Sequence, residues 1–134
     1  MSKDTFQGYV STESDEQELL IRWTEFMEIQ EPRLQLLYAI PNGGWRHPGT
    51  AARLKAEGVK AGAPDLCLPV SDGIFHGLYI EMKKRDHSNR PTKEQKRWIK
   101  LLAEQGYRVD VAYGADEAIN ILCEYLSIES EVWI

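Results

Sequence analysis

Apolar and polar positions follow two periods along this chain. Residues 78–83 alternate with a period of two, which predicts a strand with leucine, isoleucine and methionine on one face and tyrosine, glutamate and lysine on the other. Near residues 12–30 the spacing is helical, and the stripe expected to be buried consists of Leu19, Leu20, Trp23, Phe26 and Met27. The pattern therefore predicts a chain that combines helices with strands.

The same periods, together with turn and capping residues, predict eight elements. In chain order these are a helix at 12–30, a strand at 34–40, a short helix at 50–57, strands at 65–70 and 77–83, a helix at 92–105, a strand at 107–113 and a helix at 115–126. A short turn joins the two middle strands and a helix precedes the last strand, so the central sheet should be mixed. We expect an α/β fold of order α-β-α-β-β-α-β-α, with the mostly apolar first strand inside the sheet.

Length and composition are those of one globular domain. The 134 residues are 43% hydrophobic and 28% charged, and no apolar run approaches the roughly 20 residues of a membrane span. We expect a single domain over residues 1–134, with its core at about 12–126. Cys67 and Cys123 fit no zinc-binding spacing and residues 1–4 begin no apolar signal segment, so a reduced, cytoplasmic setting is the simplest interpretation.

Positive charge is concentrated in one segment of an acidic chain. The net charge is −5, yet residues 83–100 contain eight lysine or arginine residues against two acids, a local charge of +6. Such a segment can form a phosphate-binding surface. A solvated helix face is the alternative, and charge alone favours that alternative.

Two carboxylates and an amine are expected to meet on the middle strand pair. Asp65 opens one strand, and Glu81 and Lys83 share a face at the end of the next. Carboxylates placed in this way can bind Mg²⁺ and a reactive water. Glu16 borders the apolar stripe of the first helix, where it is either a member of this site or a first-turn acid favoured by the helix dipole.

The longest glycine- and proline-rich stretch, residues 41–49, directly follows a predicted strand. Asn42, Arg46 and His47 within it can donate hydrogen bonds to phosphate oxygens, although a plain Asn-Gly turn is the commoner outcome. Farther along, Thr92 and Gln95 have the spacing of a capping box at the start of a helix.

Several of these residues together resemble a known nuclease family. Pro64-Asp65 followed by Glu81-Met82-Lys83 matches the PD-(D/E)xK motif, which by itself arises often by chance. The flanking motifs, in order, are Ile40-Pro-Asn-Gly-Gly-Trp-Arg46, the helix from Ala52 to Gly58, Gly62-Ala-Pro-Asp-Leu66, Gly77-Leu-Tyr-Ile-Glu-Met-Lys83, Gln95 with Trp98, and Gly106-Tyr-Arg-Val. This ordered set resembles the virus-type replication-repair nuclease (VRR-NUC) domain over about residues 12–126.

The resemblance implies a restriction-endonuclease-like core and divalent-metal-dependent cleavage of DNA. Asp65, Glu81 and the backbone carbonyl of Met82 would bind Mg²⁺, with Mn²⁺ able to substitute for it. Lys83 would orient the attacking water or stabilise the developing negative charge. The site would thus hydrolyse phosphodiester bonds.

The resemblance also implies roles for residues outside the strand pair. Glu16 would be the first-helix acid near the metal, with Glu13 as its rival because the register of that helix is open, and Gln95 would face the site. Contacts to DNA would come from Asn42, Arg46, His47, Lys84, Arg85, Lys93 and Arg97.

Short stand-alone members of this family, often from phages and bacteria, resemble archaeal Holliday-junction resolvases in fold and in forming dimers. We therefore expect a homodimeric, structure-selective endonuclease that acts on branched or four-way-junction DNA, without a membrane partner. A flap-directed or restriction-like nuclease is the alternative enzyme. A non-catalytic DNA-binding module and a purely structural domain are the alternatives outside enzymes.

Overall fold

The computed structural model of the protein describes residues 10–41 and 47–129. In chain order its elements are helix α1 (Glu13–Met27), 3-10 helix η1 (Pro32–Leu36), strand β1 (Tyr38–Ala39), helix α2 (Pro48–Ala56), strands β2 (Leu66–Leu68) and β3 (Leu78–Lys83), helix α3 (Lys93–Glu104), strand β4 (Arg108–Tyr113) and helix α4 (Ala115–Leu126). The predicted α/β class is confirmed. Of the helices in these two parts of the chain, none is both long and apolar enough to cross a lipid bilayer.

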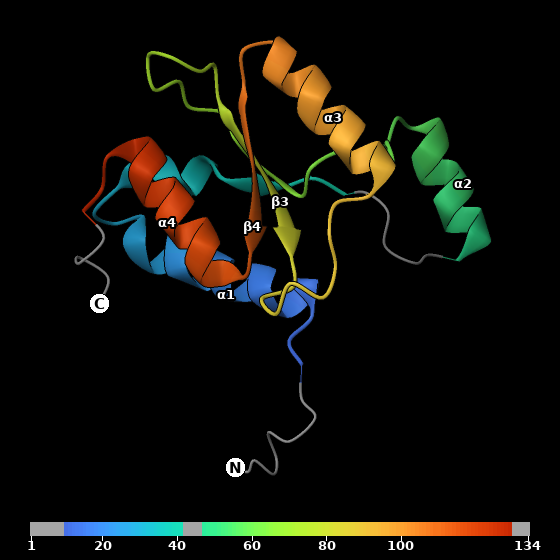
Figure 1. Ribbon diagram of the computed structural model, residues 1–134, viewed down its shortest axis with the longest axis horizontal. Coiled ribbons are helices and arrows are strands. Elements are labelled where there is room, and N and C mark those ends of the chain that lie inside the picture. The colour runs from blue at the N-terminus through green and yellow to red at the C-terminus, as the bar shows by residue number, and fades with distance from the viewer. Residues whose placement is uncertain (1–9, 42–46, 130–134) are drawn as a thin grey trace.

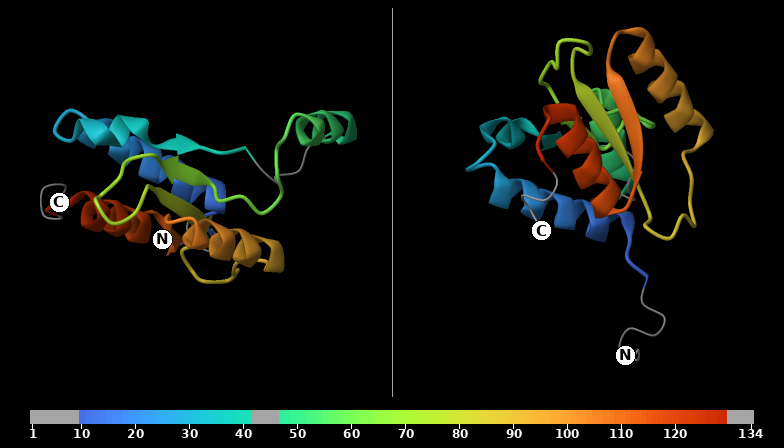
Figure 2. Two further views of the ribbon diagram at one scale, coloured as in Figure 1. Left: turned by 90° about the horizontal axis from the view of Figure 1, so that it is seen from above. Right: turned by 60° about the vertical axis from the view of Figure 1, so that its left-hand side comes forward.

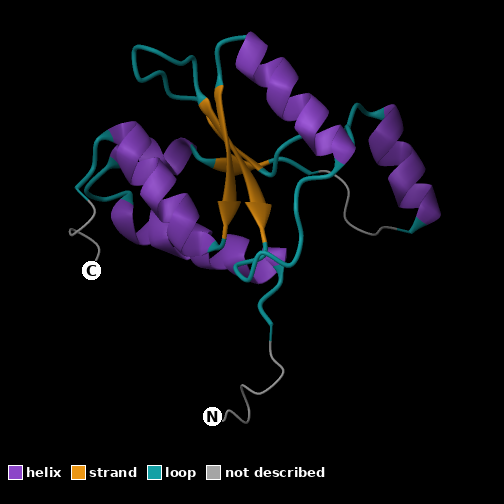
Figure 3. Cartoon of the chain, viewed as in Figure 1, coloured by secondary structure: helices purple, strands orange, loops and turns teal. Residues whose placement is uncertain are grey.

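The strands form one mixed sheet of order β1-β2-β3-β4 (Figure 3). The β1–β2 and β2–β3 pairs are antiparallel, and the β3–β4 pair is parallel. The short turn between β2 and β3 forces an antiparallel pair, whereas α3 crosses over between β3 and β4 and allows a parallel one. The predicted mixed sheet is therefore confirmed, and the short turn and the helical crossover explain it as expected.

Helices α1 and α4 pack against each other and cover one face of the sheet, while α3 lies on the other side of β3 and β4 (Figure 1). The core between the sheet, α1 and α4 is built from buried aliphatic side chains, among them Leu20, Leu66, Ile80, Met82 and Leu122. Helix α2 buries no side chain and extends away from the other elements (Figure 2). The sheet face opposite α1 is thus only partly covered.

The strand predicted at 34–40 is wrong over most of its length. Pro32 occupies the first turn of η1, where Glu31 accepts a hydrogen bond from the Arg33 N–H, and only residues 38–39 remain extended. Proline fixes a backbone angle that suits the start of a helical turn, so the apolar run begins helically. β1 is also an edge strand rather than an internal one, and both of its residues are exposed.

The apolar stripe predicted on α1 is only partly buried. Leu20 and Met27 lie in the core, but Leu19 and Phe26 are exposed, Phe26 by 67%. On α3, Leu101 is exposed as well. A helix that packs on a sheet from one side buries a narrow arc, and residues at the edge of the arc remain in solvent.

Candidate active site

The antiparallel pairing of β2 with β3 places Asp65 opposite Glu81. Leu66 pairs with Ile80, so the next step outward along both strands aligns Asp65 with Glu81 on the face opposite the core. The Oδ2 atom of Asp65 accepts a hydrogen bond from the Met82 N–H at 2.7 Å. This bond fixes the Asp65 carboxylate just before β2 begins, beside the part of β3 that continues past β2.

Glu81 is a buried carboxyl group with an unsatisfied oxygen. Its side chain is 2% exposed, and its Oε1 atom has no hydrogen-bond partner among the described residues. Burial, and then the neighbouring charge of Asp65, raises the pKa of Glu81 from its ordinary value of 4.5 to about 8. A buried carboxylate of this kind is stabilised by a cation, and an acceptor oxygen without a donor is a site for one.

Lys83 supplies a cation two residues farther along the same strand face. Its side chain is 5% exposed, and its Nζ atom lies 3.5 Å from Glu81 Oε2 and 3.4 Å from Glu13 Oε2. Figure 1 shows why α1 takes part, since the end of β3 reaches the first turn of that helix. Asn89 also donates a hydrogen bond to Glu13 Oε2. The structure therefore brings Glu13, the rival in the sequence-based assignment, to Lys83 and Glu81.

Glu16 lies in a different polar cluster. It is 1% exposed and accepts hydrogen bonds from Arg85 Nη2 at 3.1 Å, from Arg85 Nε at 3.2 Å, from the Ala115 N–H at 2.8 Å and from the Ser11 hydroxyl. Burial opposes ionisation, but these donors together hold the pKa of Glu16 below its ordinary value. Glu16 thus joins the start of α1 to the start of α4 and to the segment after β3.

Gly114 makes that junction sterically possible. It has a φ of +96°, and a Cβ atom at this position would lie 3.1 Å from Arg85 Cβ and 3.3 Å from Glu16 Oε1. Positive φ and close approach are both conditions that favour glycine. The sequence pattern gave no sign of the Glu16–Arg85 pair, because its members are separated by 69 residues.

Gln95 forms the capping box that its spacing predicts. Its Oε1 atom accepts from the Thr92 N–H at 2.8 Å, and its own N–H donates to Thr92 Oγ1 at 3.1 Å. These bonds satisfy two amide groups at the start of α3. Its role toward a substrate, implied by the resemblance, stays a prediction.

The residues expected to contact DNA have varied environments. Lys93 is exposed, Lys84 is half-buried, and His47 caps α2 by accepting from the Gly49 N–H. Arg97 pairs with Glu94 at 2.9 Å. Two further candidates, Asn42 and Arg46, lie outside the described residues.

Arg85 is the most constrained member of the same set. Besides its bonds to Glu16, its Nη1 atom lies 2.9 Å from Asp116 Oδ2. A guanidinium held by two carboxylates is a weaker candidate for binding phosphate, because three of its five N–H donors already bond to those carboxylates. Asn89, which the sequence did not single out, joins the segment after β3 to the site, because its side chain bonds both to Glu13 and to the Lys84 N–H.

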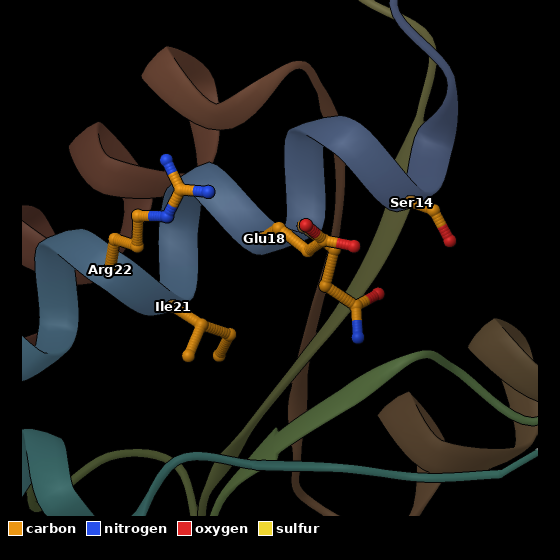
Figure 4. Close-up of a pocket in the computed structure, with 5 residues that line it drawn as sticks. Ser14, Glu18, Ile21 and Arg22 are labelled. Atoms are coloured by element: carbon orange, nitrogen blue, oxygen red, sulfur yellow. The ribbon is translucent and has the colours of Figure 1, made fainter.

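The pocket drawn in Figure 4 is not part of this site. It has a volume of about 390 Å³ and is lined by Ser14, Gln17, Glu18, Ile21 and Arg22, all on α1. Its two charged side chains have opposite signs, and neither Asp65 nor Glu81 contributes to it. The carboxylates and the lysine of the strand pair are therefore separate from this pocket.

The donor set at the strand pair fits a hard divalent cation. Among the described residues, no group of three or more histidine, cysteine, aspartate or glutamate side chains could hold a metal ion. Two carboxylates suffice for Mg²⁺, however, because it usually keeps several waters and binds one or two carboxylates together with substrate phosphates. The unsatisfied Oε1 atom of Glu81 is the structural observation that supports such a site.

The pH dependence of stability should report the buried Glu81 carboxyl. Its pKa is raised in the folded protein, so between pH 4.5 and about 8 the folded state binds more protons than the unfolded state, and stability falls as pH rises. Glu81→Gln removes this effect, so in metal-free buffer its stability advantage over wild type should grow by about 1 kcal/mol per pH unit across this window. Urea unfolding at pH 5, 6.5 and 8 measures the difference. A constant difference across these pH values would contradict the raised pKa, and Glu104→Gln, an exposed acid on α3, is the control.

A mixed sheet that brings together an aspartate, a glutamate and a lysine from a PD…ExK pattern is characteristic of one class of protein, the PD-(D/E)xK nucleases. The family model for the VRR-NUC domain matches residues 11–116. The chain therefore belongs to the VRR-NUC family, whose members are nucleases that act on DNA and generally use divalent metal ions.

A solved structure agrees with this assignment. A chain described as a VRR_NUC domain protein has 33% sequence identity and a TM-score of 0.75, over 90% of this chain and 93% of that one. A comparison with curated proteins gives no match. The family predicted from the ordered motifs is thus confirmed by sequence and by structure.

Proposed function

We propose that this protein is a divalent-metal-dependent, structure-selective endonuclease that hydrolyses phosphodiester bonds in branched DNA, most like a Holliday-junction resolvase. The observation that carries the proposal is the Glu81 carboxyl group, which is buried, has an unsatisfied oxygen and lies between Asp65 and Lys83. A structural domain without a ligand has no need of such an arrangement, since a buried polar atom without a hydrogen-bond partner opposes folding.

Asp65, Glu81 and the Met82 carbonyl would hold Mg²⁺, and Mn²⁺ would substitute for it. The Met82 N–H points to Asp65, whereas the Lys83 carbonyl accepts from Gly114 on the other side of β3. Because successive residues of a strand direct their backbone groups to opposite sides, the Met82 carbonyl faces the Asp65 side. When bound, the cation supplies charge stabilisation at the phosphate and lowers the pKa of a bound water.

Lys83 and Glu13 are the chain's own groups beside this water. The Lys83 ammonium group, held between Glu81 and Glu13, is positioned to donate to the attacking water or to a phosphate oxygen. Glu13 orients the ammonium group from α1 and is our proposal for the first-helix acid. Glu16 is proposed as a structural acid instead, because four hydrogen bonds already use its oxygens.

Binding of DNA would use the basic segment after β3 and the exposed face of α3. Lys84 and Lys93 are our first choices for phosphate contacts, since neither amine forms an ion pair with another residue in the described parts of the chain. His47 is exposed at the start of α2 and is a further one. Phosphate contacts fix register without reading sequence, so selectivity should come from the shape of the DNA and affinity should fall steeply with salt.

A symmetric cut across a four-way junction needs two sites, which a two-fold homodimer supplies. The exposed apolar residues of α1 support this assembly. Leu19 and Phe26 are 46% and 67% exposed and are seven residues apart, so they lie on one face of the helix. Large exposed apolar side chains that gather in this way are typical of protein interfaces.

Purified protein should cleave a labelled four-way junction in Mg²⁺ or Mn²⁺ and should be inactive with EDTA. The junction should be cut faster than a 5′ flap, and the flap faster than linear duplex, because two paired sites match the two-fold shape of the junction. Gel analysis of the three substrates at equal concentration measures this order. Preference for the flap or for linear duplex would favour the other nuclease types, and binding without any cleavage would favour a DNA-binding module.

A further inference from the structure

A groove lies on the partly covered face of the sheet, directly beside the candidate active site. It has a volume of about 420 Å³, and β1, β3, α3 and the segment after α2 contribute to it. Its lining includes Tyr38, Val59, Lys60, Pro64, Tyr79 and Trp98. Apolar and aromatic surface therefore dominates a concave region that the catalytic chemistry does not use.

Two tyrosines from neighbouring strands form one side of this groove. Tyr38 pairs with Cys67 and Cys67 pairs with Tyr79, so the three residues form one row across the sheet. Cys67 lies between the two tyrosines in this row. Tyr79 also packs edge-on against Tyr107, with 5.4 Å between ring centroids and 73° between ring planes. The packing against Tyr107 holds the Tyr79 ring in place before any ligand arrives.

The side chains of Tyr38 and Tyr79 are uncharged near neutral pH. Burial, followed by the interaction with Cys67, raises the pKa of Tyr79 to about 12, and the interaction with Cys67 raises the pKa of Tyr38. Neither ring therefore adds negative charge beside a phosphate chain. Tyr38 is 51% exposed, so its ring is accessible from solvent.

Trp98 of α3 forms the opposite side of the groove, and Gly62 lets it approach closely. Gly62 has a φ of +90°, and a Cβ atom there would lie 2.9 Å from Trp98 Cδ1 and 2.6 Å from Glu94 Cγ. Any larger residue would push α3 away from the segment that leads to Asp65. Close packing of Gly62 against α3 therefore defines this side of the groove.

The groove and the active site share two chain segments. Pro64 in the groove immediately precedes Asp65, and Tyr79 is two residues before Glu81 on the same face of β3. Two residues along a strand span about 6.6 Å, so a ligand in the groove is a direct neighbour of a phosphate at Asp65 and Glu81. At the rim, Lys60 offers a cation and Glu57 an acid.

We propose that this groove holds one unpaired nucleobase of the bound DNA, stacked on Tyr38, Tyr79 and Trp98 beside the phosphate that is cut. The inference rests on the proposed nuclease function and adds a substrate requirement to it. Aromatic rings bind bases of any sequence, because every base has a π face, whereas a base inside an intact duplex is already stacked on its neighbours. The groove thereby favours DNA with an unpaired nucleotide at a branch point over continuous duplex.

The test uses full-length protein carrying Glu81→Gln, which leaves bound DNA uncut, and a Y-shaped DNA with single-stranded arms. One abasic site is moved through the nucleotides around the branch, and affinity is measured by fluorescence anisotropy. At one position the abasic site should weaken binding by about 5-fold to 100-fold, the range of one lost base–aromatic stack. At the other positions it should have little effect.

Variants at Tyr38 test whether the effect of the abasic site arises in the groove. Adding Tyr38→Ala should weaken binding of the intact DNA and abolish the sensitivity to the abasic site, whereas Tyr38→Phe should keep both. Tyr38 is half exposed on an edge strand, so these variants should fold, which circular dichroism checks. Ile74→Ala, at an exposed apolar residue of the turn between β2 and β3 that does not line the groove, is the matched control and should behave as the parent.

Different failures have different meanings. If no abasic position matters, or if Tyr38→Ala keeps the sensitivity, the inference is overturned while cleavage by wild-type protein still supports the nuclease. If Tyr38→Ala alters only the oligomeric state in analytical ultracentrifugation, the groove is a protein interface and the inference is again overturned. If wild-type protein cuts no DNA but the abasic effect appears and needs Tyr38, the base-binding groove is supported and the nuclease proposal fails.

Discussion

Replacing Asp65 by asparagine should reduce DNA cleavage by about 1,000-fold, the scale of loss when one preorganised charge-stabilising group is removed from an active site. The asparagine Oδ1 atom can still accept the hydrogen bond from the Met82 N–H, so the local backbone should be kept. What disappears is the negative charge opposite Glu81, and with it the attraction for a divalent cation. Initial rates of junction cleavage in saturating Mg²⁺ measure the loss.

The controls for this variant separate chemistry from folding. Its urea midpoint should be equal to that of wild type or higher, because repulsion between Asp65 and Glu81 is relieved. Glu104→Gln changes an exposed acid at the end of α3 and should leave cleavage unchanged. Cleavage by Asp65→Asn within a factor of three of wild type would rule out Asp65 as a metal ligand.

Replacing Glu16 by alanine should destabilise the fold by about 3 kcal/mol, the scale for breaking a buried, hydrogen-bonded ion pair. The change removes both bonds to Arg85 and leaves the buried Ala115 N–H at the start of α4 without its acceptor. It also leaves space where a buried side chain had been. Chemical denaturation at pH 7 measures the loss, and Glu18→Ala, at an exposed position of the same helix, should change stability by less than about 0.5 kcal/mol.

Glu13 gives the matching comparison on the same helix turn. If Glu13 is the acid of the site, Glu13→Ala should reduce cleavage while lowering stability much less than Glu16→Ala does, since Glu13 contacts Lys83 and Asn89 at a partly exposed position. The opposite result, with Glu16→Ala stable but inactive, would make Glu16 the first-helix acid. Both variants are assayed below their melting temperatures, so that lost activity is not lost folding.

The pattern of the sequence predicted the elements that carry the site, and it failed for the first strand and for the width of the buried arc on α1. Strand β3 and the capping box of α3 follow from alternation and from side-chain caps, which act over a few residues. The first strand failed because Pro32 begins a helical turn inside an apolar run. The exposure of Phe26 could not be read from its spacing, because the width of the buried arc depends on what packs against the helix.

The sequence by itself determined that Glu81 and Lys83 share a strand face, that an aspartate opens the preceding strand, and that the ordered motifs are those of one nuclease family. These features depend on spacing along the chain, which a single periodicity controls. Only the tertiary structure decided that Glu13 reaches Lys83 across 70 residues, while Glu16 is held by Arg85 and Ala115. The rotation of α1 about its axis is set by the sheet and by α4, so which carboxylate faces the site is a property of their packing.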